Sequence, residues 1–167
     1  MFNASPSTAK RYQAGVEMAE LMGVDRFQRL FRETASLDAD KTDVRYMNDL
    51  VNRKLHSLLV AAQGAARVDG RDVIEAGDFP VTAGLQECLQ AFEALETEVD
   101  LESILQQLAD LPPLQLAYGE DMRARLPLIA GAVAVAIART LKALKPDMEK
   151  PEPAQWDRVE EILKIVL

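Results

Sequence analysis

The pattern that most constrains this chain is an order of helices that occurs twice: short helix, long helix, short helix. The first long helix is predicted for residues 44–68, where apolar side chains recur at steps of three and four residues. The second is predicted for residues 122–144, and Asp43 and Asp121 stand just before the two helices at an offset of 78 residues. A repeat of this kind predicts two similar helical units.

The remaining helices divide the chain into three parts. Residues 7–22 are predicted to form a helix that has no counterpart later in the chain, so residues 1–23 are interpreted as an N-terminal appendage. Residues 24–96 and 97–167 are the two predicted halves, and a chain of 167 residues suits one compact domain with a shared core. The four short helices of the halves are expected at 24–35, 80–95, 100–111 and 154–167.

The composition restricts the classes of protein that this chain can represent. It is 49% hydrophobic and 28% charged, which is typical of a soluble globular protein. The apolar stretch 126–138 ends at Arg139 and is too short to cross a bilayer, and residues 1–6 do not resemble the start of a signal peptide. Cys88 has no second cysteine with which to pair. We therefore expect a cytoplasmic protein without membrane association.

Three stretches carry a resemblance to a known family: 29–32, 70–74, and Leu126-Pro127 with the small-residue helix that follows. From Val24 onward the chain resembles a small bacterial histone-fold family of unknown function, in which one polypeptide supplies both halves of the usual dimer. The resemblance implies an all-α protein, an intramolecular pseudodimer of two three-helix units. Fusion has a physical rationale, because one unit cannot bury the apolar stripe of its long helix and a fused partner has a high effective concentration.

The same resemblance implies an ion pair in the loop after each long helix. Histone-fold proteins place an arginine early in this loop and an aspartate seven positions later, at the start of the third helix. Arg71 and Asp78 have this spacing, with two β-branched residues between them where the family has a short β-type stretch. Lys150 and Asp157 repeat the spacing, and Lys150 follows Arg71 by 79 residues. We expect a direct Arg71–Asp78 pair and a looser Lys150–Asp157 copy.

Residues that could hold a metal ion or perform catalysis are better explained by structural roles. Asp38, Asp40 and Thr42 resemble the first half of a calcium loop, but the sixth position lacks the required glycine, so helix capping is favoured. His56 is the only histidine and lies at the edge of the apolar stripe, and Cys88 lies on an apolar face. Phosphate-loop and nucleophile-elbow motifs are absent. We expect no metal site, no cofactor, no small-molecule substrate and no enzymatic activity.

The charge distribution bears on DNA binding, which the resemblance raises because histone dimers bind DNA over paired loops and paired first helices. The candidate cations are Lys41, Arg45 and Lys150 at one end, Arg71 at the opposite end, and Arg26 and Arg29 at the centre. The net charge is -8, and proteins that coat DNA normally have the opposite sign. Both halves are acidic: residues 24–96 carry 9 basic and 13 acidic groups, and residues 97–167 carry 8 and 12. A continuous DNA-binding surface is therefore not expected.

Two functions remain open at this point. The leading interpretation is a non-enzymatic protein that binds a protein partner or associates with itself. The alternative is an architectural protein that binds DNA weakly and without sequence specificity, through Lys41, Arg45 and Lys150. An enzyme that acts through scattered carboxylates is a third interpretation. Salt-dependent retention of DNA distinguishes the first two, because phosphate contacts weaken steeply as salt rises.

Overall fold

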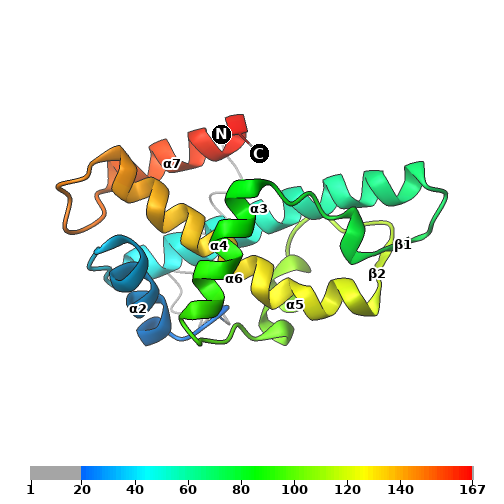
Figure 1. Cartoon of the computed structure of the whole chain (residues 1–167), viewed down its shortest axis with the longest axis horizontal. Helices are drawn as coiled ribbons and strands as arrows, with labels where there is room; N and C mark the ends of the chain where they lie inside the picture. Colours follow the sequence, from blue (N-terminus) through cyan, green and yellow to red (C-terminus); the bar gives the residue numbers. More distant parts are fainter. Residues whose placement is uncertain (1–19, 167) are drawn as a thin grey trace.

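The computed structural model describes residues 20–166, with only the backbone at Val166. Within these residues the chain is all-α, with six α-helices, one 3₁₀ turn and two very short strands (Figure 1). Most of the helix expected at residues 7–22 lies outside the described residues, and residues 20–23 are not helical. In chain order the elements are α2 (Val24–Ala35), α3 (Lys41–Val68), β1 (Val73–Ile74), η1 (Ala76–Asp78), α4 (Ala83–Ala94), α5 (Leu101–Leu108), β2 (Ala117–Tyr118), α6 (Glu120–Leu144) and α7 (Pro153–Val166).

Helix caps explain where the observed bounds differ from the predicted ones. Asp40 and Asp43 form a capping box: Asp43 N donates to Asp40 Oδ1 at 2.9 Å, and Asp40 N donates to Asp43 Oδ2 at 3.0 Å. Helix α3 therefore begins at Lys41, three residues before the predicted start, and the capping role of Asp40 is confirmed. The predicted start of the third helix at Pro80 is wrong, because the hydroxyl of Thr82 caps α4.

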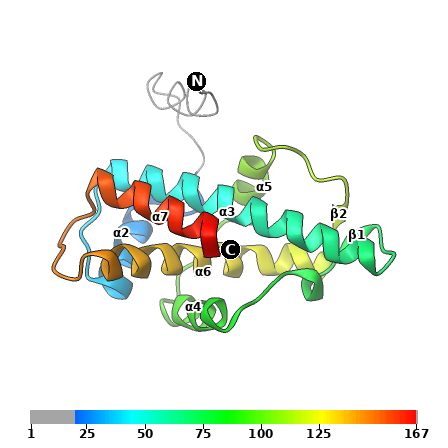
Figure 2. The ribbon, with the colours of Figure 1, turned by 90° about the horizontal axis from the view of Figure 1, so that it is seen from above.

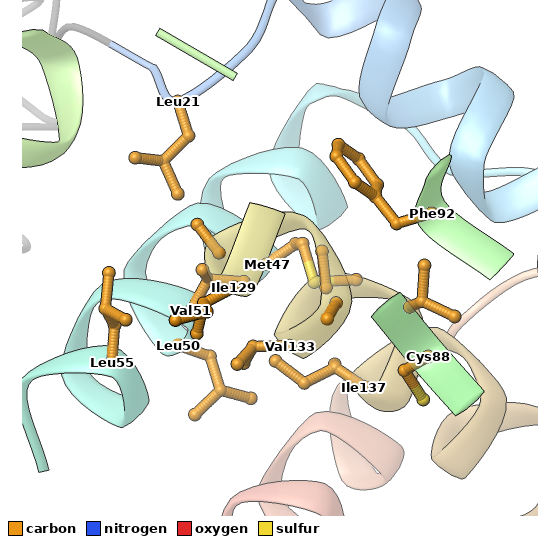
Figure 3. Packing of buried hydrophobic residues seen from close by; sticks show 14 of the residues in the cluster. Leu21, Met47, Leu50, Val51, Leu55, Cys88, Phe92, Ile129, Val133 and Ile137 are labelled. Atoms are coloured by element: carbon orange, nitrogen blue, oxygen red, sulfur yellow. The ribbon is translucent and has the colours of Figure 1, made fainter. Parts of the chain in front are cut away.

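The core lies between the two long helices. Helices α3 and α6 pack against each other, and α4 covers the side of α6 that faces away from α3 (Figure 2). Figure 3 shows side chains of all three helices in the core, among them Val51 of α3, Val133 of α6 and Phe92 of α4. Gly131 allows α4 to approach α6 closely, because a Cβ atom at this position would lie 2.4 Å from the ring of Phe92. The expected contact between the two long helices is present.

Helix α6 is long and apolar enough to span a bilayer by length and composition. However, 61% of its most apolar 18-residue window is buried inside the protein. Gly131 and the alanines around it, including Ala130, Ala132 and Ala134, are buried. Core packing therefore accounts for the hydrophobicity of this helix.

The two strands connect the halves of the chain. They pair in parallel, with Val73 opposite Ala117 and Ile74 opposite Tyr118. A further backbone hydrogen bond, from Gly119 N to Ile74 O, is 2.8 Å long. The loop that follows α3 is thereby held beside the loop that precedes α6. The sequence indicated a β-type stretch at the first strand, but it did not identify the partner strand.

Candidate interaction sites at the two ends of the long helices

Each end of the α3–α6 pair brings the loop before one long helix beside the loop after the other (Figure 1). We call them the Arg71 end (residues 69–78 and 117–121) and the Asp43 end (residues 38–43 and 148–156). The strand pair joins the loops at the Arg71 end. At the Asp43 end, the backbone N–H of Asp38 donates to the carbonyl oxygen of Glu149 at 2.8 Å. The two ends are thus built from corresponding segments of the repeat.

The Arg71 end contains the expected ion pair. The guanidinium of Arg71 contacts both carboxylate oxygens of Asp78, at 2.7 Å through Nη1 and 2.6 Å through Nη2. Its Nη2 also contacts Asp69 at 2.9 Å, and its Nη1 contacts Glu75 at 3.0 Å. Such a two-point contact is the strongest arrangement that an arginine and a carboxylate form. It lowers the pKa of Asp78 to about 2 and raises the pKa of Arg71.

Asp121 reaches across this end from the second half. Its Oδ2 accepts a hydrogen bond from Ala76 N at 3.2 Å, and its Oδ1 accepts one from Met122 N at 2.8 Å. The same carboxylate therefore contacts the first turn of α6 and the loop after α3. Its side chain is exposed, so both contacts are made in the presence of solvent.

At the Asp43 end, the expected ion pair between Lys150 and Asp157 is not formed, so this prediction is wrong. The ammonium of Lys150 instead donates to Asp40 Oδ2 at 2.7 Å and to Asp43 Oδ2 at 2.9 Å, both in the first half. Asp157 is exposed on the first turns of α7, whereas the Asp38–Glu149 hydrogen bond brings Lys150 to the start of α3. The contact with Lys150, together with the Asp43 N–H, lowers the pKa of Asp40 to about 2.

Trp156 completes the Asp43 end. Its indole N–H donates to Asp43 Oδ1 at 3.1 Å, and both residues are buried. The indole ring packs edge-on against Phe31, with centroids 6.2 Å apart, and lies 5.7 Å from the ring of Tyr46. No role was expected for this contact from the sequence. The offset of 78 residues between Asp43 and Asp121 shows that they occupy the same place in the repeat, but it does not identify the partner of either carboxylate.

The cations expected at the centre of a DNA surface also have partners in the chain. Arg26 donates to the carbonyl oxygen of Glu98 at 3.2 Å, and Arg29 forms an ion pair with Glu33 on its own helix. Both arginines are exposed and lie on α2. The structure therefore places them on one helix, where each already has an acceptor.

Lys41 and Arg45 lie on the first turns of α3, near Lys150, as the sequence analysis expected for one end of the molecule. Both side chains are exposed. Arg71 lies at the opposite end, so the structure does not bring these candidate cations together.

A family model described as a domain of unknown function (DUF1931) matches residues 27–164. The chain belongs to this family. An uncharacterised protein of Aquifex aeolicus is 26% identical to it over 155 residues, which cover 90% of this chain and 91% of that protein.

Two solved structures are similar to this DUF1931 chain. A crystal structure of a Thermus thermophilus protein is 44% identical, with a TM-score of 0.84, and the match covers 88% of this chain and 99% of that one. A crystal structure of an Aquifex aeolicus protein has a TM-score of 0.67 at 24% identity, over 90% of this chain and 99% of that one, and shows a shared fold. These relatives agree with the mostly helical architecture.

Cys88 and His56, which were considered for metal binding or catalysis, lie in packed or hydrogen-bonded environments. Within residues 20–166, no group of three or more His, Cys, Asp and Glu side chains is placed to hold a metal ion. Cys88 is buried in the core, and burial raises the pKa of its thiol. The His56 Nε2 atom lies 2.7 Å from the carbonyl oxygen of Pro112 and so links α3 to the segment before β2.

Proposed function

We propose that this DUF1931 chain is a histone-fold pseudodimer that acts as a protein-interaction or assembly module. The histone-fold part is supported by the packing of α3 on α6 and by the pairing of a loop before one long helix with a loop after the other at both ends. The Arg71–Asp78 pair, at the spacing that the histone-fold resemblance implies, adds to this support.

The observation that carries the functional part is the state of the cations at the two ends. Arg71 is bound by Asp78, and Lys150 is bound by Asp40 and Asp43. A DNA phosphate would have to replace these charge-assisted hydrogen bonds, which are about twice as strong as neutral ones. These two cations are therefore better suited to fix the loops at the two ends than to bind a nucleic acid.

The wider charge distribution supports the same proposal. Residues 72–122, from β1 to the start of α6, contain 12 acidic side chains and no lysine, arginine or histidine. Together with the net charge of -8, this segment produces a field that repels a polyanion. A protein surface with basic groups is the complementary partner.

The lowered pKa values of two carboxyl groups are consistent with a non-enzymatic role. Asp40 and Asp78 each have a pKa of about 2 because a cation is hydrogen-bonded to the carboxylate. A general acid or base works best when its pKa is near the working pH, so these two groups are poorly suited to proton transfer at neutral pH. Their hydrogen bonds fix loops instead.

Fluorescence anisotropy with a labelled DNA duplex at physiological salt tests whether this protein binds DNA. We expect no submicromolar affinity and a shallow salt dependence, because a steep dependence requires roughly seven or more phosphate contacts. Submicromolar binding that disappears in the K41E/K150E double variant would contradict the proposal and support an architectural DNA-binding protein.

Light scattering on the purified chain, followed by cross-linking in native lysate, tests the interaction itself. We expect either a defined oligomer or a stoichiometric protein complex that persists after nuclease treatment. A monomer that forms no stoichiometric complex would contradict the proposal.

A further inference from the structure

Helix α7 covers one face of α3 along the first part of that helix. The two helices run in the same direction, because Trp156 contacts Asp43 and Tyr46 while Glu160, further along α7, binds Arg53. Asp43, Tyr46 and Arg53 are separated by three and seven residues, so they lie on one face of α3. Figures 1 and 2 show that α3 extends beyond the end of α7 toward the Arg71 end.

The same face of α3 continues beyond the end of α7. Further steps of three and four residues from Arg53 lead to five residues that we call the uncovered face: Ser57, Val60, Ala61, Gly64 and Val68. All five are exposed in the described part of the chain, and none is charged. The exposed fraction is 46% for Val60 and 87% for Val68, the last residue of α3. The interface between α3 and α7 thus continues as an exposed apolar surface.

The shape of the uncovered face suits a second helix. Its widest side chains are the two valines, and the position that a Cβ atom of Gly64 would occupy has no other atom within 4 Å. A helix with longer aliphatic side chains can therefore approach the backbone of α3 closely at this position. Such a helix would continue the line of α7 and bury Val60 and Val68.

The charges beside the uncovered face favour an acidic partner. Between Asp49 and Asp69, α3 has no acidic side chain, although the whole chain has a net charge of -8. Arg67 is exposed and lies three residues from Gly64, so it borders the uncovered face. Its guanidinium donates to the side-chain oxygen of Gln115, which is a neutral acceptor. The positive charge of Arg67 is therefore available to a carboxylate of a partner.

We propose that the uncovered face binds an amphipathic helix of a protein partner. The aliphatic side of that helix packs on α3 in line with α7, and a carboxylate on its flank pairs with Arg67. This mode of binding reads apolar residues at intervals of three, four and seven along the partner helix. The uncovered face lies outside the acidic segment 72–122, so this contact is separate from the basic surface expected there. The inference rests on the proposed role as an interaction module and names one surface and one partner chemistry.

The test is an NMR titration of the full-length ¹⁵N-labelled protein with three synthetic helical peptides. Two peptides carry the same leucine face, flanked by glutamate in one and by lysine in the other. The third has the glutamate flanks and serine in place of leucine. We expect saturable shifts of the backbone amides of residues 57–68 with the leucine–glutamate peptide, about tenfold weaker binding of the leucine–lysine peptide, and no binding of the serine peptide. No shift with the leucine–glutamate peptide, or equal affinity for any two peptides, would overturn the proposal.

An exposed substitution keeps the test independent of folding. Ala61→Glu places a charge in the middle of the uncovered face and should weaken binding of the leucine–glutamate peptide at least tenfold. Gln90→Glu adds the same charge at an exposed position of α4 and should leave binding unchanged. Equal effects of the two variants would show general electrostatics and reject the site. If a stoichiometric protein complex forms equally well with Ala61→Glu, the interaction function stands and this surface is rejected.

Discussion

At the Arg71 end, the cation binds within its own half, because Arg71 and Asp78 lie in the same segment. At the Asp43 end, Lys150 reaches across to Asp40 and Asp43 of the other half. Arg71 and Lys150 thus occupy corresponding places in the repeat. The contacts of Arg71 with Asp78 stabilise one loop, whereas the contacts of Lys150 join the two halves. The repeat preserves the position of the charged residues without preserving their partners.

The difference is clearest for the two aspartates that precede the long helices. Asp43 is 5% exposed and accepts hydrogen bonds from the indole of Trp156 and the ammonium of Lys150. Asp121 is exposed and accepts backbone hydrogen bonds. We therefore expect the buried contacts of Asp43 to contribute more to stability than the exposed contacts of Asp121.

The largest effect is expected from Asp43→Ala. The substitution leaves the buried indole N–H of Trp156 without an acceptor and breaks the capping box, so it should lower the free energy of unfolding by about 2–3 kcal/mol. Asp121→Ala, the matched control at the Arg71 end, should cost about 1 kcal/mol or less because solvent replaces its contacts. Urea unfolding measures the free energy of unfolding of the two variants. Equal losses of free energy would show that the two aspartates contribute equally to stability.

Exchange of the cation at each end gives a smaller effect. Arg71→Lys loses the two-point contact with Asp78 and should lower Tm by a few degrees. Lys150→Arg should change Tm by less, because the ammonium of Lys150 is exposed and contacts two separate carboxylates. Differential scanning calorimetry at neutral pH provides the measurement. A larger decrease of Tm for Lys150→Arg than for Arg71→Lys would contradict this prediction.

Acid titration tests both ends together. Asp40 and Asp78 have folded-state pKa values of about 2, below the ordinary value of 3.8. The ionised carboxylates therefore stabilise the fold above about pH 4, and this contribution is lost as the pH falls from 3.8 toward 2. We expect Asp40→Asn and Asp78→Asn each to reduce the dependence of unfolding free energy on pH in this window. Unchanged pH profiles would show that these ion pairs do not contribute.

The smallest effect is expected from an exposed ion pair between the end of α6 and the segment before α7. Lys145 and Glu152 are 3.3 Å apart, and about half of each side chain is exposed. Exposed ion pairs of this kind contribute little, so Glu152→Gln should change the unfolding free energy by less than about 0.5 kcal/mol. Urea unfolding measures the change, and a loss comparable to that of Asp43→Ala would mean that burial does not determine the ranking.

Most of the helical architecture was predictable, because it depends on local periodicity and chain breakers. The range of α2 agrees with the prediction, and α6 begins only two residues early. The error at Pro80 arose because a proline suits a first helical turn, while the stronger signal was the hydroxyl cap at Thr82. Boundaries thus depend on which of several competing caps is used.

The contacts at the ends were predictable only where both partners lie in one loop. The Arg71–Asp78 pair was expected from the resemblance to histone-fold proteins, which place both partners in this one loop. Trp156 and Asp43 are separated by 113 residues, and no periodicity relates an indole to a distant carboxylate. The same limit applies to Lys150, because the sequence offered Asp157 as a local partner and gave no sign of the packing that brings Asp40 closer.

The long sequence separations between α3 and α7 have a consequence for synthesis on the ribosome. Arg53 pairs with Glu160 over 107 residues, and Lys54 donates to the carbonyl oxygen of Leu163 over 109 residues. At translation rates of about 5–20 residues per second, these partners emerge roughly 5–20 s after α3. During that interval the side of α3 that contacts α7 is available to chaperones. Nascent chains that lack α7 should therefore be bound by chaperones and digested by proteases more readily than the finished protein.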